Sequence, residues 1–271
     1  MRSKILGLVC VVLSTLVTTN ATASTTVDKV YRFRPGLHLS HQRPLSNKEI
    51  RTLLSGLSFW TGLSDICINT RGDIDLGDRT RFVNGSVIAR QLLIAAVDSR
   101  DSFTIQSSNQ SSTVAFAQIE ATERYASGDG VHHNGWILRV DFADFAELRG
   151  DNRALAAFDP AINVLHELTH GVLGYFDPLE PDDELGQCER YINQIRNELE
   201  LPRRAYYYPR SPDGKTTNSE RKLTFRRPES GGELSVVFSL EKVFDLSKAK
   251  SRSANQSDLL AQRRASDFSK K

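Results

Sequence analysis

Hydrophobic residues recur at helical spacing in four segments of the chain, each bounded by helix start or stop signals. Ser46 followed by Glu49 is the pattern of a capping box, in which side chain and backbone cap each other. Asp159 and Pro160 fit the N-cap and first position of a later helix, which Asp177-Pro178 would end. The pattern predicts helices over residues 46–56, 84–98, 159–174 and 184–201.

Alternating polar and apolar residues predict strands between the second and third of these helices. The alternation is strictest over residues 135–142, where Trp136, Leu138, Val140 and Phe142 would share one face. The order of these elements, with helix first, strands next and helices last, predicts an α+β fold. We expect a mixed or antiparallel sheet that packs on the helix of residues 159–174. Strands are expected at 60–68, 103–106, 114–120 and 135–142, and a later hairpin at 222–227 and 233–240 around Pro228–Gly232.

The first 23 residues have the pattern of a secretory signal peptide. Arg2 and Lys4 precede an apolar run over residues 5–17, and Ala21-Thr22-Ala23 is a cleavage site. That run is too short to span a bilayer, and no later apolar stretch is long enough. We therefore expect an exported protein, periplasmic or secreted if the source is bacterial, without stable membrane insertion after cleavage behind Ala23.

Composition divides the remainder into a central domain with extensions. An N-terminal extension covers residues 24–45, the main domain 46–208, a linker and hairpin 209–245, and a basic, serine-rich tail 246–271 that we expect to be disordered. The formal net charge is +2, so no acidic polymer is implied as a partner. The tail has no interleaved aromatic residues apart from Phe268, so we expect no nucleic acid partner.

Residues 166–170 read His-Glu-Leu-Thr-His, an H-E-x-x-H motif on the third predicted helix. Histidines four apart lie on one face of a helix, so both imidazoles can reach one zinc ion. Glu167 between them can take a proton from water, which points to metal-assisted hydrolysis with one Zn²⁺. The alternative is an ordinary amphipathic helix that carries His166 and His170 without a metal.

A catalytic zinc needs a third protein ligand. The H-E-x-x-H-x-x-G-x-x-H pattern would place it at Phe176, and Asp177 is one residue too late, so the sequence argues against a ligand in this stretch. Glu189, on the next predicted helix, is the favoured third ligand, with Asn193 one turn later on the same face. Alternatively, Glu189 is a solvated helix glutamate that pairs with Arg196 or Arg190. The rival ligands are the acidic residues Glu180, Asp183 and Glu184.

The motif and the Glu189 helix resemble the gluzincin metallopeptidases. The run Glu189–Pro202 is similar to the closing helix of a bacterial effector and toxin metallopeptidase group, in which Asn-x-Ile-Arg-x-Glu-Leu-Gly-Leu-Pro follows the H-E-x-x-H helix. The chain differs at Glu200, where that group has glycine, and at Asn193, where many gluzincins have aspartate. The resemblance covers residues 135–208. It implies a zincin-like fold, Glu189 as ligand, and a strand at 135–141 that pairs with an extended peptide substrate.

Five residues are candidates for further roles around this site. His133 could stabilise an oxyanion and Tyr207 could donate to a tetrahedral intermediate, although solvation and packing are the ordinary roles of such residues. Asn193 could orient a ligand histidine. In an oxidising compartment Cys67 and Cys188 could form a disulfide, or stay two separate thiols.

Together these patterns predict an exported zinc metallopeptidase that acts on a protein or peptide. One alternative is a non-catalytic exported protein with a structural metal site, and another is an amide hydrolase acting on cell-wall links. Glu167 favours an enzyme, because a purely structural site does not need this residue.

Overall fold

A computed structural model of the chain describes residues 34–240 except 110, 112, 123, 127–129, 179–184 and 213–218. The predicted signal peptide and basic tail lie outside these residues, as do Glu180, Asp183 and Glu184. No helix in the described part is both long and apolar enough to cross a membrane.

The main sheet has four strands in the order β1-β4-β8-β5, and its mixed pairing confirms the predicted α+β class. Strands β1, β4 and β8 run parallel, while β5 pairs with β8 in the antiparallel direction. Strand β8 therefore lies inside the sheet, and β5 forms its edge beside the helices. The strands are β1 (Gly36–Leu39), β4 (Ser102–Ser107), β5 (Ala117–Ala121) and β8 (Gly135–Val140).

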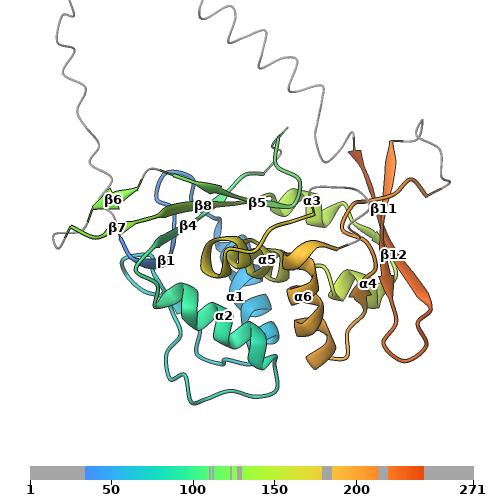
Figure 1. The fold of residues 1–271 in the computed structure, drawn as a ribbon, viewed down its shortest axis with the longest axis horizontal. Coiled ribbons are helices and arrows are strands. Elements are labelled where there is room, and N and C mark those ends of the chain that lie inside the picture. The colour runs from blue at the N-terminus through green and yellow to red at the C-terminus, as the bar shows by residue number, and fades with distance from the viewer. Residues whose placement is uncertain are drawn as a thin grey trace, which may run out of the picture. The chain divides into compact units, whose positions relative to one another are not determined.

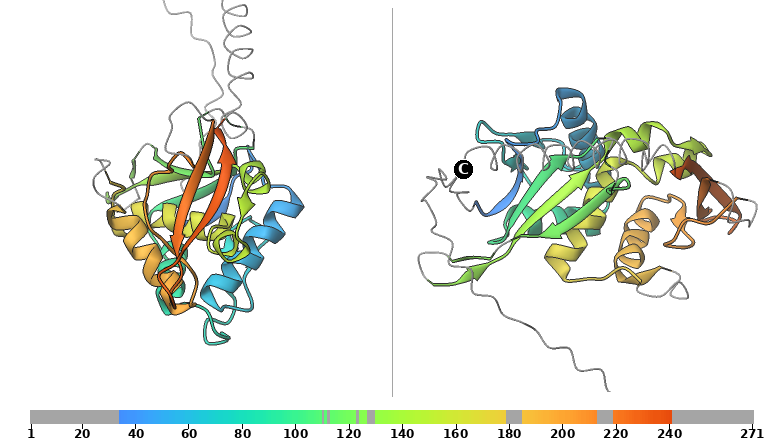
Figure 2. Two further views of the ribbon diagram at one scale, coloured as in Figure 1. Left: turned by 90° about the vertical axis from the view of Figure 1, so that its right-hand side faces the viewer. Right: turned by 90° about the horizontal axis from the view of Figure 1, so that it is seen from above.

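The helix with the motif, α5 (Pro160–Leu173), lies between this sheet and the other long helices. It packs against β5 and β8 on one side and against α1 (Asn47–Thr61), α2 (Val87–Val97) and α6 (Gly186–Glu198) on the others (Figure 1). Figure 2 shows the sheet lying across α5 from above. The motif is thus carried by the most enclosed helix of the fold.

Local sequence signals position α5 at both ends. The Asp159 side chain accepts a hydrogen bond from the backbone N–H of Ile162 (2.8 Å) and another from Nε1 of Trp60 in α1 (3.0 Å). At the other end, Gly174 takes the left-handed conformation (φ 66°) as the C-cap. Within the helix, a Cβ on Gly171 would lie 2.4 Å from the ring of Phe103. The missing side chain lets the helix approach the sheet closely.

A second sheet has the order β10-β11-β12-β9 and includes the predicted hairpin (Figure 2). Strands β11 (Glu220–Arg226) and β12 (Glu233–Ser239) pair with each other, as predicted. They also pair with two short strands of the preceding chain, β10 (Arg203–Arg204) and β9 (Arg149–Gly150). The hairpin is therefore an integral part of the main domain, because its edges are satisfied by residues from within the predicted range 46–208.

This second sheet covers a separate hydrophobic cluster rich in aromatic rings. Phe116 makes edge-to-face contacts with Phe158 (ring centroids 5.2 Å apart) and Phe238 (5.1 Å). Phe225 and Val236 of the hairpin are fully buried in the same cluster. Aromatic packing therefore fixes the hairpin against the start of α5.

Three element boundaries differ from the sequence prediction. Strand β1 lies in the predicted N-terminal extension, and its Leu37 and Leu39 are buried in the main core. Helix α1 continues through Trp60 to Thr61, where Gly62 caps it in the left-handed conformation, so no strand starts at residue 60. Strand β5 begins only at residue 117, because Phe116 has a positive φ of 62° that interrupts the extended backbone.

Shorter elements complete the described fold. Phe142, predicted to end a strand, instead begins helix α3. The remaining elements are α3 (Phe142–Ala146), α4 (Asn152–Ala156), β2 (Cys67–Ile68), β3 (Ile74–Asp75), β6 (Tyr125–Ala126) and β7 (His132–His133).

Candidate metal site

Helix α5 presents His166, Glu167 and His170 together, as the motif spacing predicts. The two imidazole rings have centroids 5.5 Å apart, and His166 and Glu167 are buried. The protonated Nδ1 of His170 donates to the backbone carbonyl of Tyr175 over 2.8 Å. That tautomer leaves Nε2 of His170 free to bind a metal.

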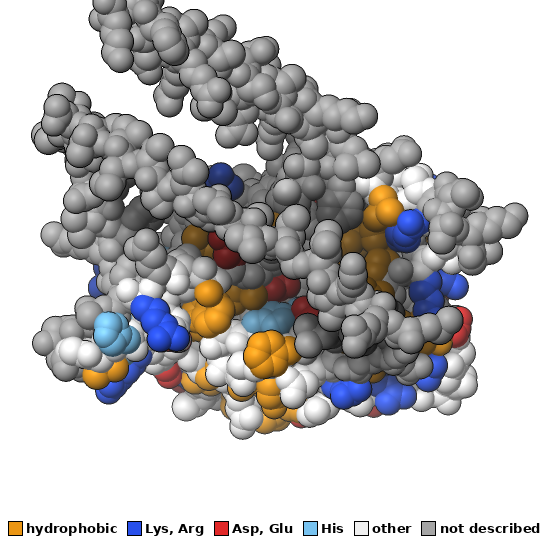
Figure 3. All heavy atoms as spheres, turned by 45° about the horizontal axis from the view of Figure 1, so that its top comes forward, with side chains coloured by type: hydrophobic (Ala, Val, Ile, Leu, Met, Phe, Trp, Pro, Cys, Tyr) orange, Lys and Arg blue, Asp and Glu red, His pale blue; other side chains and the backbone are white. Residues whose placement is uncertain are grey.

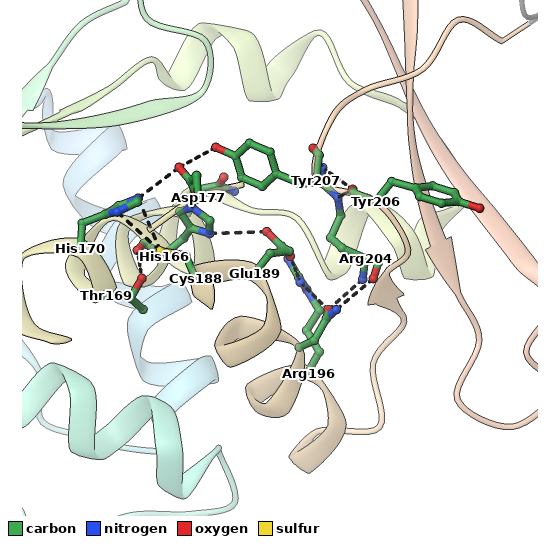
Figure 4. Close-up of polar contacts among 12 residues, drawn as sticks. His166, Thr169, His170, Asp177, Cys188, Glu189, Arg196, Arg204, Tyr206 and Tyr207 are labelled. Atoms are coloured by element: carbon green, nitrogen blue, oxygen red, sulfur yellow. Dashed lines mark hydrogen bonds and ion pairs between the residues drawn. The ribbon is translucent and has the colours of Figure 1, made fainter. Parts of the chain in front are cut away.

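Asp177 reaches both histidines. Its Oδ1 lies 3.1 Å from Nε2 of His166 and its Oδ2 lies 3.3 Å from Nε2 of His170 (Figure 4). The left-handed turn at Gly174 reverses the chain after α5 and brings this carboxylate back over the helix. The spacing argued against a ligand in this stretch because Asp177 lies one residue too late, whereas in the structure Asp177 contacts both histidines.

A fourth donor completes this group. Sγ of Cys188, on the first turn of α6, lies 3.5 Å from Nδ1 and 3.7 Å from Nε2 of His170. One ligand atom from each of His166, His170, Asp177 and Cys188 lies within 4.8 Å of all the others, so this group could hold a metal ion. Imidazole nitrogens, a carboxylate oxygen and a thiol are all donors that bind zinc.

Glu189 lies behind His166 and outside this group of four. Its Oε2 is 3.4 Å from Nδ1 of His166, and its Oε1 forms an ion pair with Nη1 of Arg196. The side chain is almost fully buried. The pairing with Arg196 was part of the alternative role for Glu189, but the side chain is buried and not solvated, as that alternative expected. The ligand role implied by the resemblance stays a prediction. In this arrangement, Glu189 orients His166 with its Nε2 toward Asp177.

Asn193 connects α6 to β10 and does not contact a histidine of the motif. Its Oδ1 accepts from the backbone N–H of Arg204 (2.8 Å) and from Nη1 of Arg196 (2.9 Å), and its Nδ2 donates to the Arg204 carbonyl (2.9 Å). The predicted contact of Asn193 with a ligand histidine was therefore wrong. The amide fits here because it donates and accepts at once, which a carboxylate cannot do. It supports Glu189 through Arg196.

Tyr207 lies at the site, whereas His133 lies on a different element. The Tyr207 ring stacks on His166 with centroids 6.1 Å apart, and its hydroxyl donates to Oδ2 of Asp177. His133 is buried in β7, which pairs with β6 in a ribbon at the opposite end of the main sheet from β11 and β12 (Figure 1). The oxyanion role predicted for His133 is therefore not supported, because the fold places that ribbon away from the motif.

Both cysteines of the described residues, Cys67 and Cys188, are free thiols. Cys67 is exposed on β2, whereas Cys188 is fully buried beside His170. The predicted disulfide between them is absent, since the thiol of Cys188 is directed toward the histidine. Each cysteine thus belongs to a different environment.

The surroundings of the histidines strongly favour positive charge. Burial lowers the pKa of His166, but Asp177 and Glu189 outweigh burial and raise it to about 10. The same balance of burial against Asp177 raises the pKa of His170 to about 11. Despite its burial, the pKa of Asp177 falls far below its usual range because both histidines contact it. The carboxylates that raise these pKa values would also favour a metal cation at this place. Both histidines would have to give up a proton to bind it, so metal binding here is expected to depend on pH.

Glu167 is the one carboxylate of the site whose pKa is raised. Burial raises it, while the nearby charges of His166 and His170 oppose the shift. The backbone N–H of Ile119, on the edge strand β5, hydrogen-bonds to this carboxylate. The base of the motif is therefore held between α5 and the free edge of the sheet.

A cavity of about 200 Å³ opens directly beside these groups. His166, Glu167, Glu189 and Tyr207 line one side of it, and the aromatic cluster under the hairpin lines the other. Figure 3 shows histidine and acidic side chains in a hollow on this face, with hydrophobic side chains beside them. The motif is thus accessible to a small group from outside.

Comparison with known proteins gives no relative for this chain: no protein-family model, curated protein or solved structure matches it.

Proposed function

We propose that this protein is an exported, zinc-dependent hydrolase of peptide bonds, with a zincin-like arrangement of α5 and α6. The observation that carries the proposal is the position of Glu167, which lies between two histidines of a potential metal site and also lines an open cavity. A structural metal site has no need for a carboxylate in that position. Export rests on the signal-peptide pattern of the first 23 residues.

The donor set fits zinc. We assign His166 and His170 as ligands through Nε2 and Asp177 as the third ligand, because Asp177 is the one carboxylate within the described residues that contacts both Nε2 atoms. Glu189 then orients His166 through Nδ1. Zinc bound there would supply a Lewis acid that polarises a carbonyl and makes water more acidic.

The chain's own residues supply the proton transfers and the binding of substrate. Glu167 takes a proton from the attacking water and delivers it to the leaving amine. Tyr207 borders the cavity, and its hydroxyl donates to Asp177, so we assign it the role of holding the third ligand in position. Its single hydroxyl proton cannot also be donated to an oxyanion, so that predicted role is not part of this proposal.

The edge strand β5 is the element that can hold an extended peptide. Strand β8, which the sequence analysis assigned to this role, has neighbours on both sides and offers no free edge. Strand β5 has β8 on one side, and on its other side the backbone of Ile119 faces Glu167. A peptide added along this edge would bring its amide bonds past the base.

Glu167→Gln tests the proposal directly. The variant should keep one equivalent of zinc and lose at least about 100-fold in peptide hydrolysis, because general-base catalysis typically contributes that much or more. Glu233→Gln, an exposed glutamate on β12, is the matched control and should behave like the parent. A Glu167→Gln protein as active as the parent on casein or a mixed peptide library would refute the mechanism.

Cys188 favours a second candidate function, a closed structural metal site. With the thiolate as fourth ligand, the set His166, His170, Asp177 and Cys188 would leave no open position for water. Substitution of zinc by cobalt decides between the two sites, since a bound thiolate gives an intense charge-transfer absorption in the near ultraviolet. We expect the parent and Cys188→Ser to have the same cobalt spectrum, and loss of such a band in the variant would support the closed site.

A further inference from the structure

The wall of the cavity opposite the motif is apolar and rigid. Phe116, Phe158, Leu223 and Phe238 line it, and all four belong to the buried cluster under the hairpin. Their rings contact each other edge to face, so the wall has a fixed shape and the cavity is preformed. A rigid apolar surface next to a reacting group selects a ligand by shape and hydrophobicity.

The backbone of Phe116 has an unfavourable conformation. Its φ of 62° is unfavourable for a residue with an aromatic side chain. The backbone is held there by two hydrogen bonds: its N–H donates to Oδ2 of Asp144 (3.0 Å), and its carbonyl accepts from the N–H of Asp141 (2.8 Å). This conformation turns the chain so that the Phe116 ring enters the cluster while residue 117 starts the edge strand.

The charged side chains of this cavity that lie outside the motif are already paired. Arg204 donates from Nη2 to the backbone carbonyls of Tyr206 (3.0 Å) and Tyr207 (2.5 Å). Glu189 is engaged by Arg196 and His166. Both side chains are thus engaged within the protein, whereas an apolar ligand group would be buried against the aromatic wall without needing a polar partner.

We infer that this cavity is a specificity pocket that takes a large apolar side chain, of the leucine or phenylalanine class, from the residue next to the scissile amide. The inference rests on the proposed peptidase function and adds its substrate class. The position follows from the lining: Glu167 and Ala117 of the edge strand both border the cavity, so a peptide lying along β5 can place one side chain in it. Polar cell-wall links do not match this surface.

The pocket can be tested by binding, apart from turnover. The probes are acetylated and amidated peptides Gly-Gly-X-Gly-Gly-Gly with X as Phe, Leu, Ala or Asp, titrated calorimetrically into zinc-loaded full-length mature Glu167→Gln protein. The Phe and Leu peptides should bind at least about 10-fold more tightly than the Ala and Asp peptides, since a filled apolar pocket is worth about 1–3 kcal/mol. Equal affinities for all four peptides would overturn the inference.

Two alanines of β5 provide a matched pair of variants in the same Glu167→Gln protein. Ala117 borders the cavity, whereas Ala121 is exposed further along the strand and does not line it. Ala117→Leu should remove the preference for Phe over Ala, and Ala121→Leu should keep it. If Ala117→Leu does not fold, Ala117→Val makes the same comparison. Unchanged selectivity in the folded Ala117 variant would exclude this cavity as the binding pocket.

The pocket and the proposed function fail in different ways. The parent could hydrolyse no peptide while the Glu167→Gln protein binds the Phe and Leu peptides selectively. This result would refute the peptidase function and support a peptide-binding pocket. If the parent hydrolyses all the peptides and binding is not selective, the peptidase function is supported and the specificity pocket is refuted.

Discussion

The hydroxyl of Tyr207 donates a 2.7 Å hydrogen bond to Oδ2 of Asp177, which lies 30 residues earlier in the chain. Burial and the neighbouring Asp177 carboxylate raise the pKa of Tyr207, so the hydroxyl keeps its proton and stays a donor. This contact ties the loop after α5 to the segment after β10, and it holds the Asp177 carboxylate facing both histidines.

Replacing Tyr207 by Phe should weaken zinc binding. Loss of a hydrogen bond to a ligand carboxylate typically costs 10–100-fold in metal affinity, and we expect a value near the lower end. Competition with a chromogenic chelator measures it. Tyr206→Phe is the control, because the Tyr206 ring packs under Arg210 and lies outside the group of four donors. Equal zinc affinity in the two variants would show that Asp177 does not need this donor.

Asp177 and Glu189 should differ in their effect on metal stoichiometry. Asp177→Asn should no longer retain one zinc through gel filtration, because it removes a ligand charge shared by both histidines. Glu189→Gln should bind zinc more weakly, by about 10–100-fold, and still reach one equivalent in excess metal. The reverse result would return the third-ligand role to Glu189, as the resemblance to gluzincins implies.

Arg196→Gln should destabilise the protein strongly. Arg196 is buried, pairs with Glu189, and donates from Nε to the Ala157 carbonyl at 3.0 Å. Removing one partner of a buried pair typically costs about 3–5 kcal/mol, and urea denaturation of the metal-free protein measures the loss. Gln194→Ala, at an exposed position on the same helix, should stay within about 0.5 kcal/mol of the parent. Similar stabilities for both variants would contradict a structural role of the pair.

Asp144→Asn should raise stability at neutral pH and above. Burial raises the pKa of Asp144 to about 7, with a smaller contribution from Asp141. The folded state therefore binds this proton more tightly than the unfolded state, and the resulting stabilisation is lost as the pH rises from about 4 to about 7. An asparagine side chain does not ionise, so the variant does not lose this stability as the pH rises. Its amide oxygen can still accept the hydrogen bond from the Phe116 N–H.

Thermal unfolding of the parent and of Asp144→Asn between pH 4 and pH 8 tests this. The variant should gain on the order of 1–2 kcal/mol over the parent at pH 8, and the gain should shrink toward pH 4. A difference that does not change with pH would mean that Asp144 carries the same charge in the folded and unfolded states.

The sequence was sufficient for those elements whose signals are local. The capping box at Ser46 and the Asp159-Pro160 start of α5 both form as predicted, with the Ser46 N–H 2.6 Å from Oε2 of Glu49 and with Asp159 bonded to the Ile162 N–H. The H-E-x-x-H spacing correctly placed two histidines and a glutamate together. Each of these signals depends on residues within four positions of each other, where helix geometry determines the result.

The strands and site residues that the sequence did not predict depend on contacts between distant segments. Strand β1 has only four residues and becomes a strand because β4 pairs with it. Strands β9 and β10 have two residues each and are formed by pairing with the hairpin. Asp177 reaches the histidines because Gly174 reverses the chain, a path that spacing rules for other loops do not describe. Phe116 shows a residue held against its own backbone preference by Asp141 and Asp144.

The pairing of β12 with β9 has a consequence for the order in which the protein matures. Synthesis proceeds from the N-terminus, so the two histidines emerge about 70 residues before Val236, which pairs with Gly150. Until that pairing forms, the aromatic wall of the cavity has no hairpin to complete it. On the proposed function, the residues of the motif are therefore synthesised well before the pocket beside them can be completed.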